Sequence, residues 1–147
     1  MSVADYYCRQ VGLRAAEFNG VDDGSSCTKS VIPRVSNLSA SSYGVIKSYV
    51  CSNIDHFASS YGDRGWGCGY RNAQMMISNL SQNPIYSECL KTSVGSSSMP
   101  SISRLQKMVE SAWQEGFDEQ GKEQLGCKLY NTRKWIGATE IVTLLSW

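Results

Sequence analysis

The sequence predicts a single domain in which helices carry most of the core, and this expectation rests on its length and on three apolar repeats. A chain of 147 residues suffices for one domain of ordinary size but not for two. Hydrophobic residues make up 41% of the chain, which is enough to form a core. Apolar side chains recur at helical spacing in three separate stretches.

The chain divides into an N-terminal segment and a folded part. Residues 1–40 are rich in Ser, Asn, Asp and Gly, and residues 22–26 have the composition of a turn, so we expect this segment to be loosely ordered. Residues 41–147 form the predicted domain. Within it, the stretch from 45 to 51 fits a helical stripe or a short strand, because its spacing does not separate the two.

The first predicted helix follows Cys68. Its apolar residues occur at the i, i+3, i+4 and i+7 positions that line one face of a helix. These are Ala73, Met76, Ile77 and Leu80. The helix should stop at Asn83-Pro84, because the residue before a proline is pushed out of the helical conformation.

Two more helices are expected further along the chain. The first has a wide apolar face and should end near Gly116, since glycine favours helix C-termini. Its apolar residues are Ile102, Leu105, Met108, Val109, Ala112 and Trp113. We expect this face to pack in the core, although Met108 and Trp113 could instead line a binding groove. The second contains Ala138, Ile141, Val142 and Leu145.

The segment from Asp63 to Asn72 places one cysteine between glycines, directly before the first predicted helix. At a helix N-terminus, unpaired amides and the helix dipole favour an anion, and a cysteine nucleophile acts as a thiolate. Arg71 could add to this positive field. Gly65, Gly67 and Gly69 would allow unusual backbone conformations and the close approach of a substrate backbone. The alternative from composition alone is a glycine-rich turn with a structural cysteine.

Three stretches of the sequence indicate a family. DRGWGCGYRNAQMM (residues 63–76) resembles the nucleophile segment of the papain-like cysteine peptidases that act on ubiquitin-fold modifier and, in one branch, on ubiquitin. Residues 135–141 resemble a second family segment, and residues 101–121 are similar to the intervening helix and turn. The likeness runs from about residue 49 to 145. It implies an α+β, papain-like fold, of which this chain holds the N-terminal, helical part that bears the nucleophile.

The same resemblance implies an activity and its residues. The sequence from Gly69 to Asn72 is similar to the branch with zinc-finger relatives that cleaves polyubiquitin chains. Cys68 corresponds to the nucleophile of a thiol protease that cuts the peptide or isopeptide bond after the C-terminal glycine of ubiquitin or ubiquitin-fold modifier. Trp66 would line a narrow tunnel for the glycine tail, or pack in the core. Tyr70 and Arg71 would support the cleft or the substrate, or anchor the start of the helix.

The assignment of a protease activity also requires the general base that the family uses. In the family, a histidine and its aspartate follow the segment that resembles residues 135–141, whereas this sequence has seven residues after Glu140 and a single histidine, His56, before the cysteine. We consider His56 as a candidate donor to the oxyanion, the alternative being a surface histidine beside Asp55. Without the base, the alternative function is an inactive fragment that binds ubiquitin-like modifiers or has no independent function. We therefore expect a piece of a longer gene product, marginally stable alone or reliant on a partner.

Composition excludes several classes of partner. A formal net charge of +1 gives no electrostatic footprint for nucleic acid or an acidic membrane, so neither is expected. The sequence has no run of about 20 apolar residues and no signal peptide, which predicts the cytoplasm or the nucleus. Six cysteines without a Cys-x-x-Cys pair predict no structural zinc. No cofactor is expected, and a disulfide framework is disfavoured in a reducing compartment.

Overall fold

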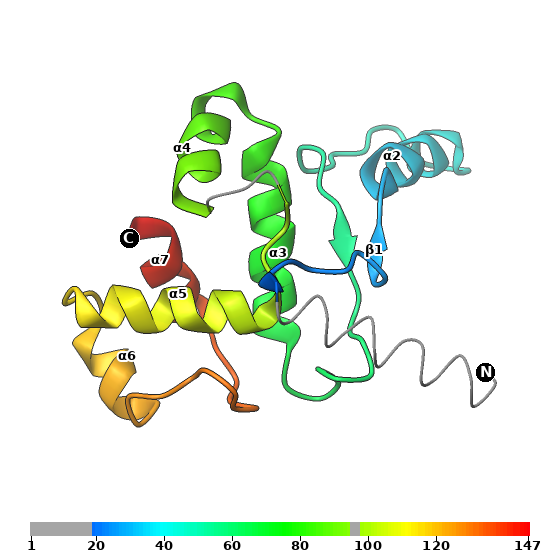
Figure 1. The fold of residues 1–147 in the computed structure, drawn as a ribbon. Coiled ribbons are helices and arrows are strands. Elements are labelled where there is room, and N and C mark those ends of the chain that lie inside the picture. The colour runs from blue at the N-terminus through cyan, green and yellow to red at the C-terminus, as the bar shows by residue number, and fades with distance from the viewer. Residues whose placement is uncertain (1–18, 95–97) are drawn as a thin grey trace.

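The computed structural model describes residues 19–94 and 98–147, which contain six helices and two short strands (Figure 1). In chain order these are β1 (Cys27–Thr28), α2 (Val31–Ser41), β2 (His56–Phe57), α3 (Cys68–Ser81), α4 (Pro84–Val94), α5 (Ile102–Gln114), α6 (Glu119–Gln124) and α7 (Ala138–Ser146). Helix α3 lies at the centre and contacts α4, α5, α7 and β2. This mixture of helices with a small antiparallel sheet agrees with the α+β class.

The helix predicted after Cys68 is confirmed as α3, but its buried face is more polar than the apolar repeat suggested. Ala73 and Ile77 are buried, whereas Met76 is exposed. The remainder of the buried face consists of Gly69, Tyr70, Arg71, Gln74 and Ser78. Helix α4 begins at Pro84, which is suited to the first turn of a helix because it has no amide proton to satisfy there.

Helices α5 and α7 confirm the other two apolar repeats. The Ser101 side chain caps α5 by accepting the Arg104 amide at 3.2 Å, and Gly116, at φ 89°, follows the end of the helix. Helix α7 begins after Gly137, whose amide donates to the Glu140 carboxylate at 2.7 Å. Trp113 is 2% exposed, so it packs in the core and does not line a groove.

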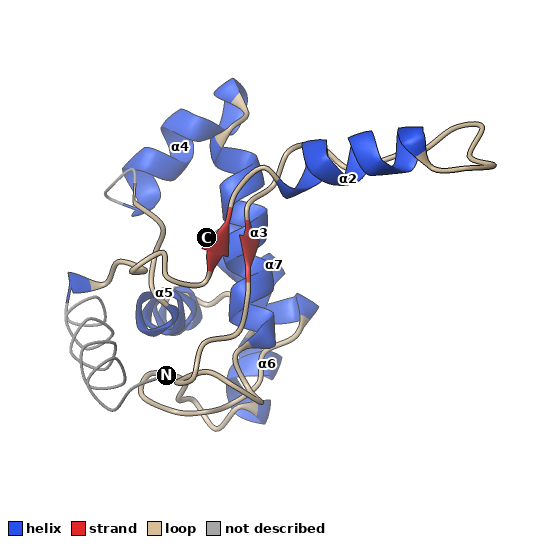
Figure 2. Cartoon of the chain, turned by 90° about the vertical axis from the view of Figure 1, so that its right-hand side faces the viewer, coloured by secondary structure: helices blue, strands red, loops and turns tan. Residues whose placement is uncertain are grey.

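Other elements were not predicted. β1 and β2 pair antiparallel, with Cys27 opposite Phe57, whereas residues 45–51 form neither a helix nor a strand. Helix α2 falls in the segment that we expected to be loosely ordered, and it projects away from the other helices (Figure 2). None of its residues is buried. Residues 1–18 of that segment lie outside the described ranges, so the boundary at residue 40 stays a prediction.

The core forms where α3, α5 and α7 meet. Leu129 and Ile136, from the stretch between α6 and α7, complete it. Its buried members are Tyr70, Ala73, Ile77, Leu105, Val109, Trp113, Leu129, Ile136, Ile141 and Leu144. The stretch that contributes Leu129 is held to α5 by Glu110, whose carboxylate accepts the Leu129 and Tyr130 amides at 2.6 and 2.7 Å. The start of α3 packs against the same stretch, because the Tyr70 hydroxyl donates to the Lys134 carbonyl at 3.3 Å.

We predict that Gly69→Ala destabilises the protein. A Cβ at residue 69 would lie 2.4 Å from the Ile136 carbonyl oxygen, and the backbone would have to move to relieve the contact. Overpacking of this kind costs about 1–3 kcal/mol. Urea unfolding should therefore show a lower midpoint for Gly69→Ala. Gly62→Ala is the control, since its nearest atom would lie at 4.0 Å. Equal midpoints for the two variants would contradict the close approach.

Candidate thiol site at the start of helix α3

Cys68 is the first residue of α3, and it is exposed. The turn before it is closed by the Trp66 and Gly67 amides, which donate to the Asp63 carbonyl at 3.2 and 2.8 Å. The Arg71 amide then donates to the Gly67 carbonyl at 3.0 Å and begins the helix. The predicted position of Cys68 at a helix N-terminus is confirmed. Its thiol lies where free amides and the helix dipole favour an anion.

The glycines around Cys68 serve the protein's own packing. A Cβ on Gly67 would lie 2.5 Å from the Asp63 Cβ, and one on Gly69 would clash with Ile136. Gly65 has φ 86°, a conformation that favours glycine, with nothing within 4 Å of its ideal Cβ position. We expected these glycines to make room for a substrate. At positions 67 and 69 the room is instead taken by neighbouring residues of the chain.

Trp66 is half-buried and fixed in place. Its indole Nε1 donates to the Gly62 carbonyl at 3.2 Å, and its ring meets the Tyr70 ring edge to face, with centroids 5.8 Å apart. It also packs against the core. Trp66 therefore combines core packing with a part-exposed surface two residues from Cys68.

Tyr70 is fully buried, and its ring belongs to the core. Its hydroxyl donates to the Lys134 carbonyl at 3.3 Å and accepts from Gln106 Nε2 at 3.4 Å. Burial raises the pKa of Tyr70 to about 12, despite the opposing hydrogen bond from Gln106. The side chain therefore anchors the start of α3. This is the structural alternative for Tyr70.

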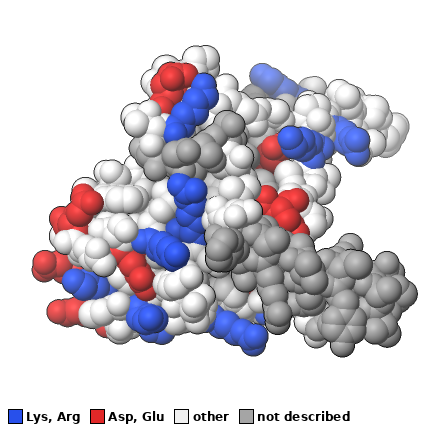
Figure 3. Space-filling view, in the orientation of Figure 1, with Lys and Arg blue, Asp and Glu red and all other residues white. Residues whose placement is uncertain are grey.

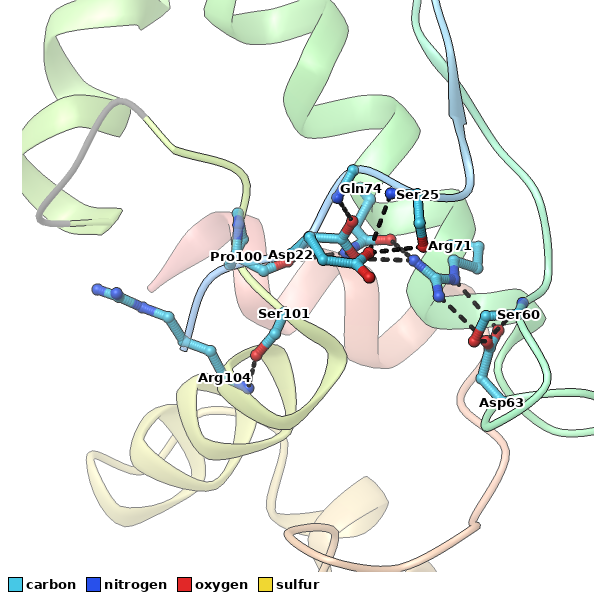
Figure 4. A network of polar contacts seen from close by, with 11 residues as sticks. Asp22, Ser25, Ser60, Asp63, Arg71, Gln74, Pro100, Ser101 and Arg104 are labelled. Carbon is cyan, nitrogen blue, oxygen red and sulfur yellow. Dashed lines mark hydrogen bonds and ion pairs between the residues drawn. The ribbon is translucent and has the colours of Figure 1, made fainter. Parts of the chain in front are cut away.

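Arg71 is buried in a network of polar contacts (Figure 4). Nε and Nη2 donate to the two oxygens of Asp63 at 3.1 and 3.0 Å. Nη1 donates to Asp22 Oδ2 at 2.8 Å and to Gln74 Oε1 at 2.9 Å. Two carboxylates thus compensate one guanidinium. The expectation that Arg71 adds to the positive field at Cys68 is corrected, since two carboxylates face its guanidinium. Its support of the cleft or the substrate stays a prediction.

The second half of this network joins distant segments. Gln74 Nε2 donates to Asp22 Oδ2 at 2.9 Å and to the Pro100 carbonyl at 2.8 Å. The Asp22 amide donates to the Met99 carbonyl at 2.8 Å, and the Ser101 amide to the Gly20 carbonyl at 3.1 Å. The sequence around Asp22 indicates only a turn. No local pattern could have paired it with an arginine 49 residues away.

His56 lies in β2 and is exposed. The amide of Asp55, directly before it, donates to Ser78 Oγ at 3.0 Å. Ser78 is ten residues beyond Cys68, about 15 Å along the helix axis. No hydrogen bond or ion pair joins His56 to Cys68 in the part of the chain that the structure describes. The role of His56 toward an oxyanion stays a prediction without geometric support.

The rest of the described surface carries mixed charge. Basic and acidic side chains are interspersed on the face in Figure 3, with uncharged residues between them. Among the described residues, no three His, Cys, Asp or Glu side chains gather closely enough to hold a metal ion. No helix within the same ranges is both long and apolar enough to cross a bilayer.

The exposed thiol at the start of a helix within an α+β fold is the arrangement of a papain-like cysteine peptidase. Comparison with known families agrees, because residues 44–147 match the model of peptidase family C78. This match covers more than half of the chain, and the chain belongs to that family. The resemblance drawn from residues 63–76 and 135–141 is confirmed.

Individual relatives point to the ubiquitin branch. The chain is 42% identical to the zinc finger-containing ubiquitin peptidase 1 of Rattus norvegicus over 147 residues, which are 99% of this chain and 25% of the relative. The Homo sapiens protein of the same name is 40% identical over the same shares. The ubiquitin carboxyl-terminal hydrolase mug105 of Schizosaccharomyces pombe is 45% identical over 96 residues, 64% of this chain and 37% of the relative. The chain thus spans about a quarter of the first two relatives.

We predict that Asp63 makes stability depend on acid pH. Burial alone would raise the pKa of Asp63, but the hydrogen bonds of Arg71 and Ser60 and the charge of Arg71 outweigh it, so the pKa falls below the ordinary 3.8. The stabilisation is therefore complete above pH 3.8 and is lost as the pH falls below it. Urea unfolding at a series of pH values should show this loss, and Asp63→Asn should be less stable at neutral pH with a shallower acid decline.

The exposed pair of Glu88 and Lys91 provides the control. The pKa of Glu88 is also lowered, by its hydrogen bond with Lys91, but the carboxylate lies at the surface, where solvent screens the pair. Glu88→Gln should therefore leave the acid decline almost unchanged. An unaltered acid decline in Asp63→Asn would show that its ionisation is not linked to folding.

Proposed function

We propose that this chain carries the nucleophile and one wall of the cleft of a thiol-dependent deubiquitinase. Membership of peptidase family C78 supports thiol-dependent hydrolysis as the chemistry. The observation that carries the proposal is the exposed Cys68 at the first position of α3. The proposed cleavage follows the C-terminal glycine of ubiquitin or of ubiquitin-fold modifier. Relatives named as ubiquitin peptidases favour ubiquitin.

In the proposed reaction, the Cys68 thiolate attacks the carbonyl carbon of the terminal glycine and forms a tetrahedral intermediate. Free amides at the start of α3 donate to the negative oxygen, and His56 is the side-chain candidate for that role. The carbon–nitrogen bond then breaks, the departing amine takes the proton that a base had removed from the thiol, and a thioester remains on Cys68. Water hydrolyses the thioester, which releases the carboxylate and restores the thiol.

The other predicted site residues act around this centre. Trp66 would line a narrow passage that admits only a glycine tail, and its part-exposed ring, packed against Tyr70, supports this role. Tyr70 and Arg71 support the passage from the interior. Nucleic acid and membrane are not among the proposed partners. The cytoplasm or the nucleus is the proposed compartment, where exposed thiols such as those of Cys51 and Cys89 stay reduced.

A second function is a module that binds ubiquitin-like modifiers without cleaving them. The reaction needs a base that takes the thiol proton and returns it to the leaving amine. No side chain in the described ranges hydrogen bonds to the Cys68 thiol. The resemblance places the base histidine after the segment of residues 135–141. A chain without that base would keep the recognition surface and lose turnover.

A covalent probe separates these two functions. The chain should form an adduct with ubiquitin or ubiquitin-fold modifier whose C-terminus carries an electrophile, as measured by intact mass, and the preferred probe would identify the modifier. Cys68→Ala should abolish the adduct, whereas Cys89→Ala, which removes another exposed cysteine, should not. Folded protein that forms no adduct but retains the probe on a column would support the binding module and overturn the enzyme.

A further inference from the structure

We propose that Asp63 and Arg71 are positioning residues for Cys68, with Asp22 fixing the second side of the arginine. This proposal rests on the proposed function of Cys68 as a nucleophile and adds the contacts that fix its position. Neither Asp63 nor Arg71 faces the exposed thiol, since both side chains are buried. Their effect on the reaction therefore passes through the backbone of residues 66–71.

Asp63 joins the turn before Cys68 to the helix after it. Its backbone carbonyl accepts the Trp66 and Gly67 amides. Its carboxylate accepts the Ser60 amide at 2.7 Å and the Ser60 hydroxyl, and it receives both nitrogens of the Arg71 fork. One residue thus closes the turn with its backbone and binds the first turn of α3 with its side chain. Cys68 lies between these two attachments.

The residues on either side of Cys68 are also held by packing. Asp63 occupies the space in which a side chain of Gly67 would stand, and Ile136 occupies the corresponding space at Gly69. The backbone on either side of Cys68 is therefore closely packed, against the turn at Gly67 and against the stretch before α7 at Gly69. A shift of the Asp63 side chain would free the first of these contacts.

Arg71 needs the geometry of its guanidinium for this role, beyond its charge. Nε and Nη2 form a fork on Asp63, while Nη1 reaches Asp22 on the other side. A lysine has the charge but a single nitrogen, so it cannot make the fork and the second contact together. Asp22 is in turn tied to Gln74 and Met99, which stops the guanidinium from rotating away from Asp63.

Such rigidity matters because a nucleophile must approach its carbonyl within a narrow range of distance and angle. A misplacement of about 1 Å can reduce the rate about 100-fold without any change in the reacting groups. We therefore expect loss of the network to slow attack and leave modifier affinity unchanged.

The experiment measures adduct formation by the 147-residue chain over a series of concentrations of the electrophile-tipped ubiquitin probe. Asp63→Asn and Arg71→Lys should each lower the maximal rate at least tenfold, with the half-saturating concentration and the final extent of reaction unchanged. Asp23→Asn is the matched control, since Asp23 is the exposed neighbour of Asp22 and its carboxylate accepts from the amide and hydroxyl of Ser25. It should react like the unmodified chain.

A purely structural role predicts a different result. Partial unfolding would lower the fraction of protein that reacts and leave the rate of the folded fraction unchanged. Leu144→Ala, a core truncation in α7, reports this behaviour. The inference is overturned if Asp63→Asn reacts at the normal rate, or if its loss matches that of Leu144→Ala at an equal folded fraction. A normal rate in Arg71→Lys would overturn the requirement for the fork.

Failure of the proposed function would give a different signature. If the unmodified chain forms no adduct with ubiquitin or modifier probes, the proposed activity fails, and the positioning inference is then tested by amide hydrogen exchange of residues 66–71. Faster exchange in Asp63→Asn than in Asp23→Asn would support the positioning role. Equal exchange in the two variants would overturn it, whatever the activity of the chain.

Discussion

The buried pair formed by Arg71 and Asp63 is the interaction on which the arrangement of the site depends. Breaking a buried ion pair by removing one partner costs about 3–5 kcal/mol, because the other charge is left without compensation. Here each partner also holds a different segment, Asp63 the turn before Cys68 and Arg71 the first turn of α3. Asp22 adds the strand-like contact of residues 20–22 with residues 99–101. The network therefore joins the turn before Cys68, the start of α3 and the paired segments 20–22 and 99–101.

The compensation of Arg71 also changes the electrostatic account of Cys68. An uncompensated arginine three residues from a cysteine would favour the thiolate, but two carboxylates face this one. The favourable terms left for a thiolate are the free amides and the dipole at the start of α3. In the proposed reaction, a separate base therefore has to complete activation of the thiol. Arg71 determines where Cys68 lies, and the helix terminus determines which charge is favoured there.

The apolar repeats predicted α3, α5 and α7 because each of these helices buries one face, and the glycine-flanked cysteine indicated the thiol site. The short elements were not predictable in the same way. Helix α2 has no buried residue, so its apolar spacing carries no information on packing. β1 and β2 have two residues each and are specified by a long-range pairing. The roles of Gly67, Gly69 and Arg71 depend on Asp63, Ile136 and Asp22, and only the folded structure brings the last two close.

The motif that identifies the family is therefore mostly a structural device. Of residues 67–71, Cys68 alone is exposed, while the other four are buried against the turn, the core or the stretch before α7. A sequence can retain residues 67–71 because they are needed for folding, whether or not a general base completes the site. Similarity to the family at residues 63–76 is therefore stronger evidence for how the thiol is positioned than for catalytic turnover. Activity also depends on a general base that transfers the proton, and residues 63–76 contain no such base.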